Sequence, residues 1–253
     1  IAFNNISKDE LSKRNLGQDI PILLNFLPNV VTTSDAGAGI GYTGIRIRGI
    51  NSQSTNVTIN GIPYNDAESL GTFWVDLPDF SSSVENLQVQ RGIGTSVNGS
   101  SAFGASINIL TDKIAEKSFF ESSNTVGSFN TIKNNFKFST GLLNNAFEFS
   151  GRLSKIDSDG YIDRASSNLK SYFLQFSYKK NKTLLKFLNF GGHEITYQAW
   201  NGIDLLTLEN NRTYNPSGLY FDLDGNEKFH ENEVDNYKQD HFQFHWTQSI
   251  SNN

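Results

Sequence analysis

Strict alternation of apolar and polar side chains over the second half of the chain is the feature that most restricts its fold. Phe136 and Phe138 alternate with polar neighbours over 133–139, and the same period of two returns over 146–154, 171–179 and 241–247. Successive side chains of a β-strand point to opposite faces, so each segment predicts a strand with one apolar and one polar face. Such strands build either a soluble sandwich or the wall of a membrane barrel, and periodicity does not separate the two.

Connection lengths favour the barrel. Residues 141–145 and 179–182 are short connections, whereas 157–168 and 191–236 are long and polar. Outer-membrane barrels alternate short periplasmic turns with long outer loops, and the order here follows that rule except for a short first outer connection at 127–130. We expect about six strands, which cannot enclose a domain of roughly 110 residues because barrel diameter grows with strand number. The sequence therefore predicts an incomplete barrel.

The first half of the chain has a different pattern, in which short β-branched runs end at glycine. Asn60 and Gly61 form a hairpin-type turn signal, and Pro63 then prevents the segment from continuing as a central strand. This pattern predicts a small sheet with tight turns. The character of the sequence changes near Lys113, where the longer alternating segments begin.

An ordered series of motifs in the first half carries a resemblance to a known family. The motifs are Leu27-Pro-Asn-Val30, Gly44-Ile-Arg-Ile-Arg-Gly49, Asn60-Gly-Ile-Pro63, Arg91-Gly92, and Gly104 followed by Ile107-Asn-Ile109. In this order they resemble the plug domain of TonB-dependent outer-membrane receptors. The resemblance implies a mainly β fold, with a small mixed α/β plug domain at 1–113 and the first antiparallel strands of a transmembrane β-barrel at 114–253. In the family, the signal peptide and the TonB box lie upstream of the plug, so we expect this chain to be an excised segment.

The resemblance also implies a function, which is the import of a scarce nutrient across the bacterial outer membrane. Its implied partners are TonB, through an upstream box, outer-membrane lipid, a small-molecule ligand such as a ferric siderophore, and a candidate surface lipoprotein. Segments 197–202, 211–216 and 235–237 resemble iron-complex receptors, which favours an iron–siderophore cargo over oligosaccharide, haem or cobalamin. A soluble β-rich glycan-binding or adhesion module is the alternative from a different class.

Composition narrows the remaining function classes. The net charge of -5, without a long basic run, argues against nucleic acid, because phosphate binding needs clustered lysine and arginine. There are no cysteines, and the motifs of common nucleophilic, zinc-dependent and phosphate-binding sites are missing. We therefore expect no catalytic residues, no cofactor and no enzyme activity. No apolar run approaches the ~20 residues of a membrane helix.

Candidate site residues follow from the family's plug loops, which rise towards the outside. Segment 64–74 corresponds to such a loop, with 34–43 and 97–101 beside it. The candidate ligand contacts in these loops and in the long outer loop are Tyr64, Asp66, Phe73, Trp74, Asn98, Tyr197 and Trp200. An aromatic residue in such a loop also packs against the barrel wall about as often, so both roles stay open. By resemblance, Arg46, Arg48 and Arg91 are plug–barrel contacts, with an ion pair to acidic groups of the wall as their role.

Two features suggest metal binding only superficially. Asp222 to Glu227 carries carboxylates around a glycine, but its spacing is too short for an EF-hand loop and predicts a solvated turn. His241 and His245 share one strand face at a distance of about 13 Å, which is too far for one ion. The sequence therefore predicts no metal site.

Overall fold

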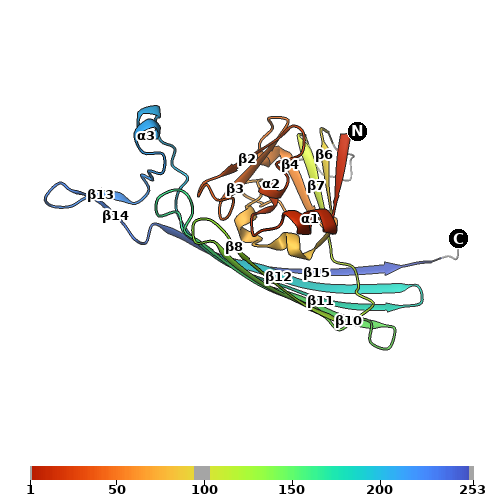
Figure 1. Cartoon of the computed structure of the whole chain (residues 1–253). Helices are drawn as coiled ribbons and strands as arrows, with labels where there is room; N and C mark the ends of the chain where they lie inside the picture. The colour runs from red at the N-terminus through yellow and green to blue at the C-terminus, as the bar shows by residue number, and fades with distance from the viewer. Residues whose placement is uncertain (1, 94–102, 251–253) are drawn as a thin grey trace.

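The computed structural model describes residues 2–93 and 103–250. Residues 2–111 form a compact N-terminal domain, which lies against one face of a long, curved sheet formed by the second half of the chain (Figure 1). We refer to these two parts as the N-terminal domain and the large sheet. The connection between them runs over residues 112–118, and the boundary predicted at residue 113 falls inside it.

The N-terminal domain is built on a five-stranded sheet of order β1-β6-β7-β4-β5. Strands β4 and β7 pair in parallel, and the other neighbours are antiparallel. A separate hairpin joins β2 to β3. The strands are β1 (Ala2–Ser7), β2 (Val30–Ser34), β3 (Thr43–Ile47), β4 (Thr55–Ile59), β5 (Ile62–Pro63), β6 (Val84–Arg91) and β7 (Ala105–Thr111).

Short helices connect these strands. They are α1 (Lys8–Arg14), α2 (Ile20–Leu23) and the 3₁₀ turns η1 (Ser52–Ser54), η2 (Trp74–Asp76) and η3 (Phe80–Ser83). Helix α1 starts at a capping box in which Ser7 and Glu10 satisfy each other's backbone N–H groups. The core between helices and sheet is apolar, with Val57, Ile59, Ile107 and Ile109 almost fully buried.

The large sheet contains six strands in the order β15-β12-β11-β10-β9-β8, all antiparallel. They are β8 (Phe119–Val126), β9 (Ile132–Ser139), β10 (Phe147–Ser158), β11 (Ser167–Lys180), β12 (Thr183–Tyr197) and β15 (Val234–Gln248). The prediction of a mainly β chain with an unclosed set of antiparallel strands is confirmed. Edge strands β8 and β15 do not pair with each other among the described residues, so the sheet is open.

The outer loop differs from its prediction. We expected residues 191–236 to form the loop, but β12 continues to Tyr197 and β15 begins at Val234. Gly191 and Gly192 lie inside β12, where the close approach of neighbouring chain atoms leaves no room for a side chain. The loop is therefore 198–233, and it holds α3 (Leu205–Asn210) and the hairpin of β13 (Leu219–Phe221) and β14 (Glu227–Phe229).

The tip of the β13–β14 hairpin forms the turn that its residues predict. One carboxylate oxygen of Asp222 accepts hydrogen bonds from the backbone N–H groups of Asp224 and Asn226, at 3.0 and 2.8 Å. Within residues 2–93 and 103–250, no three carboxylate or histidine side chains gather as metal ligands.

The polarity of the large sheet is inverted with respect to a soluble sandwich. Its outward face carries large apolar side chains, of which Phe136, Phe147, Phe149, Phe242 and Phe244 are 41 to 69% exposed. Its inward face, against the N-terminal domain, buries Lys133, Lys137, Glu148, Arg152 and Gln175. A sheet with apolar groups outside and polar groups inside is suited to a hydrocarbon surrounding. None of the helices in the described part of the chain is long and apolar enough to cross a bilayer.

A charge on the outward face tests this arrangement. Leu153 lies midway along β10, is 55% exposed and faces outward. Leu153→Arg should lower the free energy of unfolding in phospholipid vesicles by about 2 to 4 kcal/mol, because arginine at the bilayer midplane is poorly solvated. Denaturant titration measures the change, and Leu153→Met serves as the control, with a loss below about 1.5 kcal/mol. Equal stability of the two variants would contradict a lipid-facing position.

Candidate functional site

A cavity of about 340 Å³ lies between the N-terminal domain and the start of β15. We call it the β15 cavity. It is lined by Tyr42, Tyr64, Asp66, Glu68, Ser69, Phe73 and Asp76 from the N-terminal domain and by Asp235, Tyr237 and Gln239 from β15. Strand β15 follows the long outer loop directly (Figure 1). The lining residues Asp235, Tyr237 and Gln239 come from the first half of β15, so the cavity lies at the loop end of this strand.

The loop over 64–73 is held in place by Asn65. The side chain of Asn65 accepts a hydrogen bond from Val57 N and donates to the carbonyls of Thr55 and Leu70, at 2.7 to 2.9 Å. Asp66 then closes a turn by accepting from the backbone N–H groups of Glu68 and Ser69. Local polar residues therefore build a fixed loop without a hydrophobic core of its own.

Tyrosine hydroxyl groups join this loop region to β15. The Tyr64 hydroxyl donates to Gln239 Oε1 at 3.1 Å, and its ring lies against His241 with centroids 5.1 Å apart. The Tyr42 hydroxyl donates to Asp235. Burial raises the pKa of Tyr64 well above its usual value, so the phenol stays protonated and remains a donor.

Asp76 is the carboxylate that the surrounding residues leave without a partner. It is 8% exposed, and no described residue donates a hydrogen bond to its side chain or forms an ion pair with it. Its backbone carbonyl packs on β12, where a Cβ atom at Gly192 would lie 2.4 Å from it. Burial, followed by the charges of Asp235 and Asp66, raises the pKa of Asp76 to about 7.

Three of the predicted ligand contacts meet at the β15 cavity, namely Tyr64, Asp66 and Phe73. Trp74 belongs to the hydrophobic core and is 2% exposed, which favours the packing role over the ligand role. Asn98 lies outside the described residues. A ligand role for any of these residues stays a prediction.

The two candidates from the outer loop lie apart from the cavity lining. Tyr197 is buried, and its hydroxyl group lies 3.2 and 2.8 Å from the carbonyl oxygens of Ser217 and His230, so it holds the base of the loop. Trp200 is 74% exposed. Its accessibility suits a ligand contact, which remains a prediction.

The predicted plug–barrel arginines have no acidic partner within the described residues. Arg46 is exposed on β3, Arg48 has a left-handed backbone with φ of 55°, and Arg91 donates to the carbonyl of Pro28 at 3.1 Å. Their contact with a barrel wall stays a prediction. The ion pairs that the structure shows between the two parts have the reverse arrangement of charges. The N-terminal domain supplies the carboxylate, and the large sheet supplies the cations.

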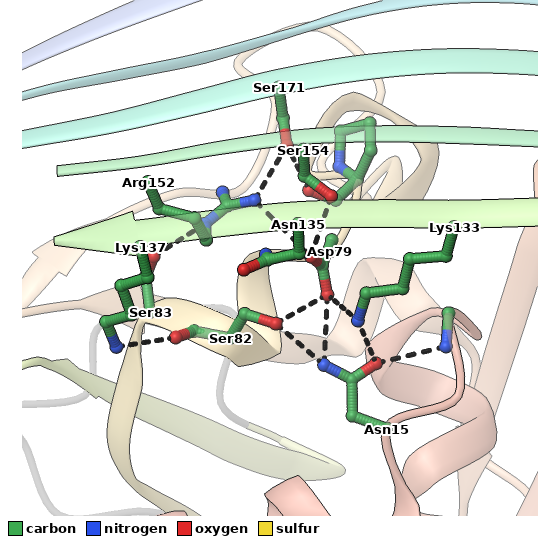
Figure 2. A network of polar contacts seen from close by, with 12 residues as sticks. Asn15, Asp79, Ser82, Ser83, Lys133, Asn135, Lys137, Arg152, Ser154 and Ser171 are labelled. Carbon is green, nitrogen blue, oxygen red and sulfur yellow. Dashed lines mark hydrogen bonds and ion pairs between the residues drawn. The ribbon is translucent and has the colours of Figure 1, made fainter. Parts of the chain in front are cut away.

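Asp79 is that anion, and Figure 2 shows the polar network around it. It lies directly before η3 with φ of 52°, a left-handed conformation that aspartate tolerates better than most residues. One carboxylate oxygen is 2.6 Å from Lys133 Nζ and also accepts from Asn15 and Ser82. The other accepts from Asn135 and Ser154 and lies 3.7 Å from Arg152.

We call Asp79 and these partners the Asp79 cluster. Arg152 also donates to Ser83 and Ser171, so its guanidinium is held by both parts of the molecule. Nearby, Asp112 pairs with Lys8 and Lys137 at 2.9 and 2.5 Å. Buried, charge-assisted hydrogen bonds thus fasten the N-terminal domain to β9 and β10, and the Ser171 hydroxyl of β11 donates to the carbonyl of Pro78.

Sequence comparison identifies the N-terminal domain. The family described as TonB-dependent Receptor Plug Domain matches residues 1–106. The N-terminal domain is therefore a plug domain of this family. The large sheet has the fold of an unclosed part of a barrel wall, and the location is the bacterial outer membrane.

The names of individual relatives specify different ligands. The chain is 29% identical over 156 residues to a vitamin B12 transporter, BtuB, of Vibrio vulnificus and 25% identical over 178 residues to the ferrienterobactin receptor of Escherichia coli. These matches cover 62% and 63% of this chain, but 25% and 24% of the relatives.

Among solved structures, Pseudomonas aeruginosa FpvA bound to a pyoverdine–iron complex matches with a TM-score of 0.71 at 13% identity. This match covers 99% of this chain and 32% of FpvA, and at that identity it shows a shared fold. The chain therefore spans about a third or less of the length of these relatives.

Neutralising Asp79 should separate the plug from the sheet. Asp79→Asn leaves the buried cations Lys133 and Arg152 without their counter-ion, so we expect a loss of about 3 to 5 kcal/mol in the stability of the docked plug. Hydrogen exchange of the plug amides measures it. Lys113→Gln is the matched control, because the Lys113–Glu85 pair is exposed and contributes at most about 1 kcal/mol. Unchanged protection in Asp79→Asn would contradict the anchoring role.

The Asp79 cluster should also be sensitive to acid. Although burial alone opposes ionisation, the charges of Arg152 and Lys133 hold the pKa of Asp79 at about 2, below its ordinary value of 3.8. A depressed carboxyl pKa stabilises the docked state above pH 3.8, and the contribution of about 2 kcal/mol is lost as the pH falls from there to 2. Exchange protection should drop over this range in the wild type and less steeply in Asp79→Asn. Parallel curves would refute the assignment.

Proposed function

We propose that this chain is the plug and the first part of the barrel of a receptor that imports an iron–siderophore complex, driven by TonB. The observation that carries the proposal is the inverted polarity of the large sheet, with a plug bound to its polar face. Such a sheet places a folded domain inside a wall that faces lipid. We propose binding and passage as its action, without a chemical step.

The arrangement supports a route for the ligand. The β15 cavity lies beside the outer loop, where a ligand arrives, and the buried ionic contacts of the plug lie across the sheet, on β9 and β10. A ligand bound at the cavity would touch both plug and wall. Phenol and carboxylate groups at this position suit a small, polar ligand with hydrogen-bonding groups.

The position of β1 supports the coupling to TonB. This strand lies at the edge of the five-stranded sheet and pairs with β6 alone. A pull on the chain upstream of Ala2 would therefore act on one strand pair before it reaches the Asp79 cluster, which joins the segment after α1 to β9 and β10. Removal of an edge strand breaks fewer hydrogen bonds than removal of a central one.

The cargo assignment rests on two of the relatives described above, the ferrienterobactin receptor and FpvA with its pyoverdine–iron complex, and on the resemblance of segments in the outer loop. Oligosaccharide, haem and cobalamin remain the alternatives within the family, and the vitamin B12 transporter gives cobalamin specific support. A surface lipoprotein is a further candidate partner.

Uptake in cells tests this proposal. Cells that depend on this receptor should accumulate radioactive iron supplied as a hydroxamate, catecholate or mixed-ligand siderophore, and deletion of TonB should reduce uptake to the background. Haem, cobalamin and a maltooligosaccharide are the comparison cargoes. TonB-dependent uptake of one of these, with no uptake of any ferric siderophore, would show that this compound is the cargo. Uptake that does not depend on TonB would overturn the mechanism.

A further inference from the structure

We propose that the β15 cavity is a subsite for an organic cation, an ammonium or guanidinium group carried by the ligand. The inference rests on the proposed function, because it assigns a chemical class to the cargo of the same receptor. Its evidence is the charge, the burial and the aromatic content of the cavity wall.

All the charged residues that line the cavity are acidic. It contains four carboxylates, Asp66, Glu68, Asp76 and Asp235, and none of its described lining residues is a lysine, arginine or histidine. Carboxylates gathered in a concave site of low dielectric create a local negative potential. Such a site attracts a cationic group and repels an anionic complex, such as an iron centre chelated by several catecholates.

Asp76 is the specific point of attachment. Asp66 is already occupied by backbone N–H groups, and Asp235 accepts from Tyr42, whereas the side chain of Asp76 has no donor within the described residues although it is more than nine-tenths buried. A buried carboxylate without a donor is costly. The packing of its backbone on Gly192 keeps it at the cavity wall, where a ligand can supply the donor.

The aromatic side chains select an organic cation over a hydrated metal ion. Tyr42, Tyr64, Phe73 and Tyr237 share the lining with the carboxylates, and aromatic faces attract ammonium and guanidinium groups. No group of three carboxylate or histidine side chains in the described part of the chain is arranged to ligate a metal ion. Aromatic faces beside a carboxylate therefore fit an alkylammonium or guanidinium group.

The ionisation of Asp76 gives the site a pH dependence. The groups that face it are Asp66 and Asp235, the neighbouring Glu194 on β12, and the hydroxyls of Tyr42, Tyr64 and Tyr237. All are acidic or neutral, so none of them stabilises the ionised form of Asp76. A bound cation would do so, and its affinity should therefore rise as the pH increases from 6 to 8.

A matched pair of small probes tests the proposal on the receptor in detergent. N-acetylarginine amide carries one guanidinium cation, and N-acetylcitrulline amide is its neutral isostere. Saturation-transfer NMR should show binding of the arginine probe at least roughly tenfold tighter than the citrulline probe, because a charge-assisted hydrogen bond is about twice as strong as a neutral one. Equal affinity for the two probes would overturn the proposal.

Variants of the lining residues test whether the arginine probe binds at Asp76. Asp76→Asn should weaken the arginine probe roughly tenfold and leave the citrulline probe unchanged, and Asp235→Asn, which keeps an acceptor for Tyr42, should weaken it less. Asp224→Asn, at the exposed hairpin tip, is the control and should have no effect. Arginine binding that persists unchanged in Asp76→Asn, or displacement of the probe by Mn²⁺ at lower concentration than by free guanidinium, would refute the organic-cation subsite.

The two proposals fail separately. If ferric siderophore uptake depends on TonB but the arginine probe does not bind at Asp76, the subsite is wrong and the transport function stands. If the probe binds at Asp76 but the receptor carries no iron complex, the subsite stands and the cargo is another cationic molecule.

Discussion

The inverted polarity of the large sheet is the constraint on which the rest of the structure depends. Once the outward face carries phenylalanine and leucine, the inward face must carry the polar side chains, and three of these are the cations Lys133, Lys137 and Arg152. Buried cations need counter-ions, since an unpaired charge in a low-dielectric interior costs several kcal/mol. The plug supplies Asp79, and the connection between plug and sheet supplies Asp112. The strand pattern of the second half therefore determines the chemistry that the first half must present.

Contacts between plug and wall change in kind across the large sheet. The Asp79 cluster fastens the plug to β9 and β10, and Phe80 of the plug packs against Phe173 of β11 and Phe190 of β12. At β15, tyrosine hydroxyls replace the ion pairs, and a cavity opens between the parts. A plug that is held by ion pairs at β9 and β10 can bind a ligand beside β15 without first giving up its main attachment.

Much of the fold was accessible from the sequence because it is encoded locally. The alternation around Phe136, Phe147 and Phe242 predicted the strands and their apolar faces, and the ordered glycine motifs predicted the plug. The loop bound at residue 191 was wrong because Gly191 and Gly192 suggest a loop, whereas here they allow close packing inside β12. That reason depends on contacts with β15 and η2, which no local pattern reveals.

Site residues were harder to predict for the same reason. The lysines and arginine of β9 and β10 were visible on the polar face of their strands, but the pairing of Asp79 with Lys133 and Arg152 spans 54 and 73 positions of sequence. Trp74 and Tyr197 were predicted as candidate ligand contacts, whereas the structure buries both, and side-chain type alone does not distinguish a packing role from a ligand role.

Two aspartates three positions apart show how this geometry separates anchoring from binding. Asp79 is buried among cations and amides that hold its pKa at about 2, whereas Asp76 is buried among carboxylates and phenols that leave its pKa raised to about 7. Burial raises the pKa of both carboxyl groups, but at Asp79 the charges of Arg152 and Lys133 outweigh it, whereas at Asp76 the neighbouring carboxylates add to it. The protein has satisfied one carboxylate with its own side chains and left the other unsatisfied at the wall of a cavity. The Asp76 carboxylate can therefore form a favourable interaction with a ligand that carries a positive charge into the cavity.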